Sequence, residues 1–545
     1  MKYILSIFLA IYLFSPVVAQ VDFVQRLEME VKFGESDYMT IFTESGLIAF
    51  RTNKDRSSSS QPIFEIFSTD FNLNKGAMNT IPVKPGYDLI GYDWNDGSFY
   101  ALFQKGNSYA SKDRYIIKIK LSEEANLEYD MSNVLDMELK EFFVLGEKIV
   151  FMGDSESLPV IQFFDIETSN VITAQGIYSK DSKILQLRKD EELGVIDVLL
   201  SKRDQYKVKQ VFVITFDLEG NKLREINLKG LDDPKMEIIE GILTPFQEYQ
   251  QALIGTYGKK KQEAYQGIYM SEINEFGEIT SKYYTLENLE NFYNYLPEKT
   301  RQRRIRSLEQ NLSKGKIPTI KPAFSSREVI TLGNGHLIYS DLFTANNPRY
   351  FPRDGVYANS FYRINPYSPF YNNMFYDPYF GYRGMPYNPN FNTSREGEYK
   401  FHAAQIILLD NNGDIVWDNA LRLPSKTTNN PSKFGELSYD GKKLHFMYLE
   451  GEKLALSYIE DGVVIFENEL FDIELINETE RIRDTQVRSL MLYWWYDNNY
   501  LLTGKQNIKY QDEDGRQQNR DVFFITKIAV DGALFDFEDS KYNSN

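Results

Sequence analysis

Short apolar runs separated by polar turns recur along most of the chain. They are five to eight residues long, rich in β-branched and aromatic side chains, and bounded by turns that contain Asn, Asp or Gly. The clearest runs are Leu47–Arg51, Ser98–Phe103, Arg114–Leu121, Lys148–Met152, Gln162–Ile166, Gly194–Leu200, Lys443–Leu449 and Leu454–Ile459. This length and composition are typical of β-strands. The pattern therefore predicts an all-β protein.

Four segments share a further pattern, in which an apolar strand ends in an Asp- or Asn-containing turn with a glycine. They are Val211–Gly220, Ile268–Gly277, Gln405–Gly413 and Phe523–Gly532. Gly and Asn accept the positive φ that a tight turn requires, so each segment predicts a β-hairpin. A hairpin that recurs in this way indicates repeated sheet units.

The spacing of the turns favours a β-propeller. Turns centred near Gly76, Asn126, Ser169, Gly220 and Gly277 lie about 43 to 57 residues apart, and Gly413, Gly462 and Gly532 follow. Propeller blades repeat at roughly 40–50 residues. We predict seven or eight blades, with N-terminal blades in residues 20–285, a strand segment in 326–344 and C-terminal blades in 399–545. Two β-sandwich-like domains remain the alternative, because turn signals do not encode how sheets close.

The wide gap between Gly277 and Gly413 must hold an insertion, and its first part, residues 286–325, is predicted to be helical and basic. Apolar residues recur at helical spacing up to Pro297, at positions Leu286, Leu289, Phe292, Tyr293 and Leu296. A basic run follows, with Lys299, Arg301, Arg303, Arg304, Arg306, Lys314 and Lys316 against the single acid Glu309. This run is either a solvated helix face or a docking surface for an acidic partner or an acidic face of the same protein.

The second part of the insertion, residues 345–398, is predicted to be a long irregular loop. Between Tyr350 and Phe391 it contains nine Tyr, six Phe, six Pro and six Asn. Proline at this density prevents a regular strand or long helix. Tyrosine-rich loops are typical of protein-binding surfaces, although a self-packed loop or a sugar-stacking surface would also fit. The candidate partner-binding tyrosines are Tyr357, Tyr362, Tyr367, Tyr371, Tyr376, Tyr379, Tyr382 and Tyr387.

The N-terminus resembles a cleavable signal peptide over residues 1–19. Lys2 precedes the apolar stretch Ile4–Phe14, and Val17–Ala19 forms a small-residue cleavage site before Gln20. The chain has no cysteine, which excludes disulfides and thiolate chemistry and favours a bacterial exported protein. We expect a periplasmic or outer-membrane-associated location, with the cell surface left open, and no transmembrane span in the mature chain.

Charge and motif content argue against several functions. A net charge of −17 makes nucleic acid an unsuitable partner. His336, His402 and His445 are scattered, and the chain lacks a nucleophile-elbow motif and a phosphate-binding loop, so we expect no cofactor and lean towards a non-catalytic protein. Weak calcium candidates are Asp410, Asp414, Asp512 and Asp514, whose turns lack the distal glutamate of a full calcium loop.

One segment carries a family resemblance. Asp410–Trp417, with its Asp, Gly and Trp, resembles one blade repeat of quinoprotein-like propellers and of the outer-membrane assembly lipoprotein of that fold. The whole chain is similar to exported bacterial proteins without an assigned function, through Asn291–Leu296, Lys299–Arg306, Tyr350–Phe391 and Val416–Ala420. The resemblance implies an envelope role. We predict a scaffold or adaptor that binds envelope proteins, and the alternative is a glycan-binding or glycan-cleaving propeller.

Overall fold

The chain is an all-β protein whose eight antiparallel sheets are the blades of a β-propeller. A computed structural model describes residues 21–32, 35–53, 61–106, 113–122, 126–206, 208–228, 231, 235–247, 249–259, 264–320, 322–345, 399–424, 427–428, 433–512 and 514–534. The signal peptide predicted at 1–19 and the candidate tyrosines of 345–398 lie outside these residues. The strands divide into two compact units, one of six blades and one of two.

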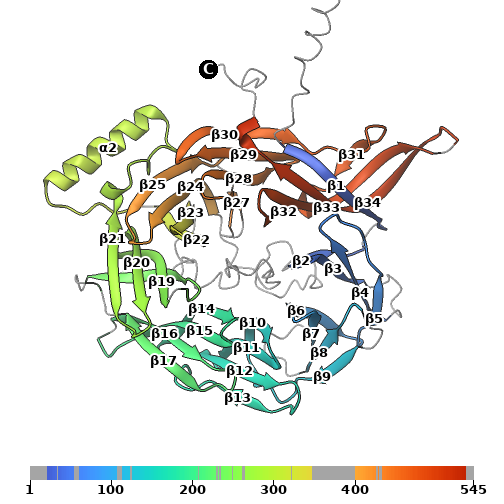
Figure 1. Cartoon of the computed structure of the whole chain (residues 1–545), viewed down its shortest axis with the longest axis horizontal. Helices are drawn as coiled ribbons and strands as arrows, with labels where there is room; N and C mark the ends of the chain where they lie inside the picture. Colours follow the sequence, from blue (N-terminus) through green and yellow to red (C-terminus); the bar gives the residue numbers. More distant parts are fainter. Residues whose placement is uncertain are drawn as a thin grey trace, which may run out of the picture. The chain divides into compact units, whose positions relative to one another are not determined.

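The six-blade unit follows the chain in order, each blade pairing its four strands consecutively (Figure 1). Blade 1 is β2 Met39–Thr43, β3 Gly46–Asn53, β4 Ile63–Asp70 and β5 Asn79–Pro82. Blade 2 is β6 Tyr87–Asn95, β7 Ser98–Lys105, β8 Arg114–Ile119 and β9 Leu127–Asp130. Blade 3 is β10 Glu138–Leu145, β11 Lys148–Ser155, β12 Leu158–Asp165 and β13 Val171–Thr173. Blade 4 is β14 Ser182–Asp190, β15 Val195–Arg203, β16 Lys209–Phe216 and β17 Lys222–Leu228. Blade 5 is β18 Met236–Leu243, β19 Gln250–Lys259, β20 Ala264–Asn274 and β21 Ile279–Thr285. Blade 6 is β22 Ala323–Leu332, β23 Gly335–Ala345, β24 Tyr399–Asp410 and β25 Ile415–Arg422, with β26 Thr427–Thr428 beside β24.

Apolar side chains from successive blades pack into the cores between them. Phe50 and Phe64 of blade 1, for example, meet Phe99 of blade 2 with ring centroids 4.7 and 5.9 Å apart. Each of these rings is fully buried, and rings at such distances add to the stability that burial of their apolar area provides. Side chains on both faces of a blade pack into these cores. This explains why the strands are apolar at almost every position.

The two-blade unit contains blade 7 and a blade that joins the two ends of the chain. Blade 7 is β27 Glu436–Tyr439, β28 Lys443–Glu450, β29 Lys453–Glu460 and β30 Val463–Asp472; blade 8 is β31 Arg481–Thr485, β32 Met491–Tyr496, β33 Asn499–Gln511, β34 Gln517–Val530 and β1 Val21–Glu30. Strand β1, from the N-terminus, pairs with β34, from the C-terminus, over nine residue pairs. In β32, Trp495 is buried and Trp494 is only partly covered, and the register with β33 shifts between Trp494 and Tyr496.

Three of the four predicted hairpin turns are confirmed. Gly220, Gly277 and Gly413 have φ of 75°, 78° and 79° and connect the third and fourth strands of blades 4, 5 and 6. The hairpin predicted at Gly532 was wrong, because a short 3₁₀ helix, Gly532–Leu534, follows β34. The strand beside β34 is β1 instead, and no local pattern could reveal a partner some 500 residues away in the chain.

The helix predicted before Pro297 was also wrong. Residues Leu286–Asn288 form a 3₁₀ turn and the following residues form irregular turns, whereas helix α2 runs from Glu298 to Ser313. Pro297 is the N-cap of α2, since proline fits at a helix start where its missing N–H costs nothing. The basic run that was expected after the helix is therefore the helix itself. No helix among the residues described combines the length and apolar character needed to cross a membrane.

Candidate functional site

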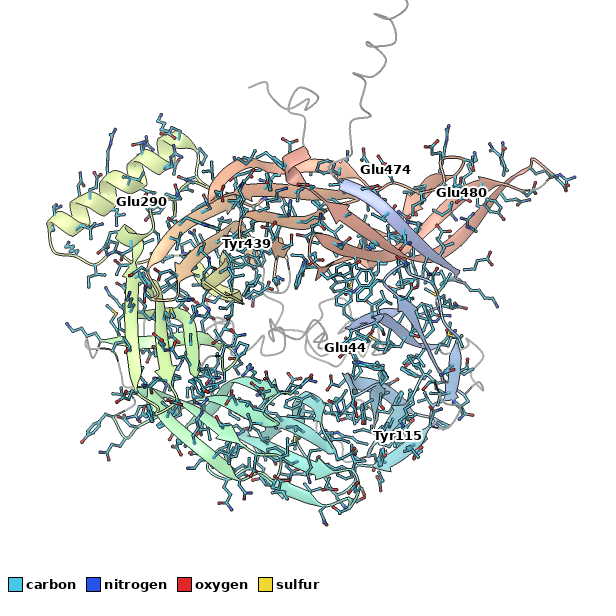
Figure 2. The ribbon with its side chains drawn as sticks, in the orientation of Figure 1. Glu44, Tyr115, Glu290, Tyr439, Glu474 and Glu480 are labelled. Atoms are coloured by element: carbon cyan, nitrogen blue, oxygen red, sulfur yellow. The ribbon has the colours of Figure 1, made fainter. Side chains whose placement is uncertain are left out.

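Helix α2 begins from a short segment that is anchored to the outermost strand of blade 6. The backbone N–H of Asn291 lies 3.1 and 3.2 Å from the two carboxylate oxygens of Asp418 in β25, and its side-chain Nδ2 donates to the Asp418 carbonyl at 2.9 Å. Figure 2 shows Glu290, the neighbouring residue, beside α2. These contacts hold the base of the helix against a strand more than 120 residues later in the chain.

Aromatic packing completes this anchor. Phe292 is 2% exposed and its ring meets that of Phe324 in β22 edge-to-face at 5.9 Å. Burial raises the pKa of Tyr295 to about 12, and the nearby Arg304 of α2 acts in the opposite direction. The apolar residues for which the sequence analysis predicted a helix, such as Phe292, therefore attach helix α2 to blade 6.

The anchor carboxylate has unusual electrostatics. Burial raises the pKa of Asp418 to about 6, and the hydrogen bonds from Asn291 and from Gln405 only partly oppose that shift. Gln405 Nε2 donates to Asp418 Oδ2 at 3.2 Å. A carboxyl group whose pKa is raised to about 6 therefore lies where the helix is attached.

The helix itself exposes most of its charge. None of its residues is buried, and Figure 1 places it outside the sheets, beside β21 and β25. Ile305, Leu308 and Leu312 lie on one stripe and are partly covered. Arg303 and Arg306 are exposed and form no ion pair with any residue in the described part of the chain. The result is a cationic face of two exposed guanidinium groups on a helix that is anchored at its base.

The predicted basic residues are therefore brought together on one helix, but they differ in role. Arg301 pairs with Glu298 one turn earlier and donates to Asn294 Oδ1 at 3.2 Å, which stabilises the first turn. Arg304 lies near Tyr293 and Tyr295, which belong to the attachment segment, the residues between β21 and α2. Arg303 and Arg306 remain available to a partner.

The weak calcium candidates Asp410, Asp414 and Asp512 accept hydrogen bonds or form ion pairs with protein groups. Asp410 Oδ1 accepts the Asp414 N–H at 2.7 Å, and Asp414 pairs with Lys282 of blade 5 at 2.6 Å. Asp512 Oδ1 accepts the N–H groups of Asp514 and Arg516 at 3.1 and 2.8 Å. The contacts of Asp410 and Asp512 are the turn chemistry expected of Asp, whereas Asp414 joins blade 6 to blade 5. The described residues contain no group of three His, Cys, Asp or Glu side chains that could hold a metal ion.

The three histidines have structural contacts. His336 Nδ1 lies 3.2 Å from Thr331 Oγ1, and His402 Nε2 lies 3.0 Å from Thr344 Oγ1. His445 Nε2 accepts the Gly532 N–H at 3.0 Å. Burial lowers the pKa of His336 and of His445 to about 4, so both are neutral at physiological pH.

Sequence reasoning missed the Asp418 anchor. The only signal was an acid, Asp418, within the otherwise apolar and amide-rich strand segment Val416–Ala420. An isolated acid within a strand is uncommon unless something pairs with it, but the sequence could not identify Asn291 as that partner.

No protein-family model matches the chain, and no curated protein matches it. Among solved structures, the polysaccharide lyase Uly1 is 7% identical with a TM-score of 0.35, over 93% of this chain and 99% of that one. TolB from Acinetobacter baumannii is 10% identical with a TM-score of 0.26, over 78% and 80%. An acylaminoacyl peptidase is 10% identical with a TM-score of 0.33, over 79% of this chain, which spans about half the length of that protein. At these levels of similarity, the comparisons carry no inference about activity.

Proposed function

We propose that the protein is a non-catalytic scaffold of the bacterial envelope, which binds an acidic protein surface through helix α2. The observation that carries the proposal is the exposed pair Arg303 and Arg306, on a helix anchored at its base in a chain of net charge −17. The Tyr-rich segment 345–398, predicted from composition, supplies a second contact surface.

Charge complementarity supports an acidic protein as the partner. Residues 299–316 carry seven positive residues and one acid, a net charge of +6. Arginine presents planar donor groups that match carboxylates in pairs, and complementary charge accelerates encounter as well as selecting partners. The partly covered stripe of Ile305, Leu308 and Leu312 offers apolar area next to these charges.

The test is a crosslinked pull-down from native envelopes with the mature protein and the variant Arg303→Glu/Arg306→Glu. We expect an acidic envelope protein to be captured by the wild type and lost by at least tenfold in the variant. Capture should also weaken between 50 and 300 mM salt, because exposed charges are screened over roughly 8 Å at physiological ionic strength.

A matched control removes the same number of exposed arginines elsewhere. Arg481 and Arg483 are exposed residues of β31, and Arg481→Glu/Arg483→Glu should capture the partner as the wild type does. Deletion of 350–391 tests the second surface separately. Equal capture by wild type and helix variant would contradict the proposal, and binding of the wild type to anionic lipid vesicles alone would assign the helix to a membrane.

A further inference from the structure

Blade 6 carries a row of buried polar side chains across its strands. Ser326 of β22 is the cross-strand partner of Ser340 in β23, which is in turn the partner of Gln405 in β24. Residues directly opposite one another in antiparallel strands have side chains on the same face, with Cβ atoms about 5 Å apart. All three residues are 0% exposed.

This row faces blade 5. Phe324, two residues before Ser326 and hence on the same face, packs against Phe292, which follows the last strand of blade 5. The Ser326 N–H also donates to Glu240 Oε1 of β18 at 2.7 Å. Glu240 is the cross-strand partner of Thr256 in β19, whose side chain is likewise fully buried.

The polar atoms along this line lack partners among the residues described. They are Thr256 Oγ1, Ser326 Oγ, Ser340 Oγ and Gln405 Oε1. Both amide atoms of Gln266 lack partners too; this residue is the extra one of a β-bulge in β20, two residues before Ile268, which is the cross-strand partner of Thr256. We call Thr256, Gln266, Ser326, Ser340 and Gln405 the interblade seam. Buried polar groups in native proteins are nearly always hydrogen-bonded to protein or to ordered water.

We propose that the interblade seam is a binding site for a chain of ordered water molecules between blades 5 and 6. Water fits because it both donates and accepts hydrogen bonds, and a buried water is held by two to four polar partners. The seam provides both kinds: Gln266 Nε2 can only donate, Gln405 Oε1 can only accept, and the three hydroxyl groups can do either. A metal cation, by contrast, would satisfy the oxygens and leave Gln266 Nε2 unpaired.

The two ends of the seam give it a role. One end is Glu240, and the other is Asp418, which accepts a hydrogen bond from Gln405 Nε2. Bound water along the seam therefore connects the carboxylate that anchors α2 to the first strands of two blades. It also provides the polar surroundings in which the amide of Gln405 can follow a change in the protonation of Asp418.

The test counts long-lived internal water by oxygen-17 magnetic relaxation dispersion on the full mature protein. The seam variant is Ser326→Ala/Ser340→Ala. The matched control is Ser271→Ala/Ser281→Ala, which removes two hydroxyl groups from blade 5 that are bonded to each other at 2.8 Å. We expect the seam variant to lose the contribution of at least one long-lived water molecule, and the control to keep the wild-type amplitude.

Three results would overturn the proposal. One is an unchanged amplitude in the seam variant. Another is an equal loss in the control variant. The last is a wild-type amplitude that depends on sodium, potassium or calcium in the buffer, which would assign the seam to a cation. If the serine variant does not fold, Thr256→Val, which preserves side-chain shape, gives the same comparison, and a loss of amplitude is again the supporting result.

Discussion

At the scale of single residues, Asp418 makes the attachment of α2 sensitive to pH. Its pKa is raised to about 6 by burial, so the folded state binds the proton more tightly than the unfolded chain does. The stability linked to this proton is fully present below about pH 4 and is lost as the pH rises through 6. Asp418→Asn keeps an acceptor for the Asn291 N–H but does not titrate.

We therefore expect Asp418→Asn to equal the wild type in unfolding free energy near pH 4 and to exceed it at pH 7. The pKa shift of Asp418 corresponds to a difference in unfolding free energy of about 3 kcal/mol at most. Urea unfolding of both proteins across pH 4–7 measures the difference. A difference that stays constant over this range would contradict the assignment, and the comparison at pH 4 serves as the internal control.

His445 should show the opposite dependence. Burial lowers its pKa to about 4, and because Nε2 accepts the Gly532 N–H, the proton of the neutral ring lies on Nδ1, facing Ser438 Oγ at 3.3 Å. Its contribution to stability is present above pH 6.5 and is lost as the pH falls through 4. Between pH 7 and pH 4 the unfolding free energy of the wild type should fall by about 3 kcal/mol more than that of His445→Gln. Hydrogen exchange at the Gly532 amide reports the same change locally, and parallel pH profiles would refute it.

At the scale of elements, a buried ion pair connects three blades of the six-blade unit. Lys189 Nζ of β14 lies 3.3 Å from Asp93 Oδ2 of β6, and the same carboxylate oxygen accepts the Val144 N–H of β10 at 2.7 Å. Both charged side chains are only 2% exposed. Lys189 Nζ also pairs with the more exposed Glu191 at 2.9 Å, so removing Lys189 leaves the Asp93 carboxylate buried and without its cation, which typically costs about 3–5 kcal/mol.

Lys189→Met should therefore destabilise the protein by about that amount in urea unfolding, and Asp93→Asn in the same chain should restore part of the loss. The control is Lys148→Met, whose pair with Asp165 is more exposed and should cost about 1 kcal/mol or less. If the double variant is as unstable as Lys189→Met alone, the pair does not act as a unit.

The elements also show what the sequence could and could not predict. Strands and the turns at Gly220, Gly277 and Gly413 were predictable, because alternation and positive φ are local properties of the chain. The helix was misplaced because apolar residues of the attachment segment, such as Phe292, recur at helical spacing while serving to dock on blade 6. The Asp418–Asn291 contact joins distant positions, so no local pattern encodes it.

At the scale of the whole molecule, the two chain ends depend on each other through blade 8. Besides its backbone pairing with β34, β1 provides Arg26, which donates to Gln506 Oε1 of β33 at 2.8 Å, and Glu28, which pairs with Arg520 of β34 at 2.7 Å. Arg520 also pairs with Glu480, next to β31, at 2.7 Å. Loss of β1 would expose the edge of β34 and leave this network incomplete.

A chain of residues 31–545 should therefore lose hydrogen-exchange protection along β34 and unfold at a lower urea concentration than a chain of residues 20–545. A synthetic peptide of residues 20–32 added in trans should restore both, because it supplies the nine paired residues and the charged contacts. A peptide of the same composition in scrambled order is the control, since it retains the charge but not the register. Full protection in the truncated chain would mean that blade 8 is stable on its four C-terminal strands alone. Rescue by the native peptide only would instead establish that the strand following the predicted cleavage site completes the fold.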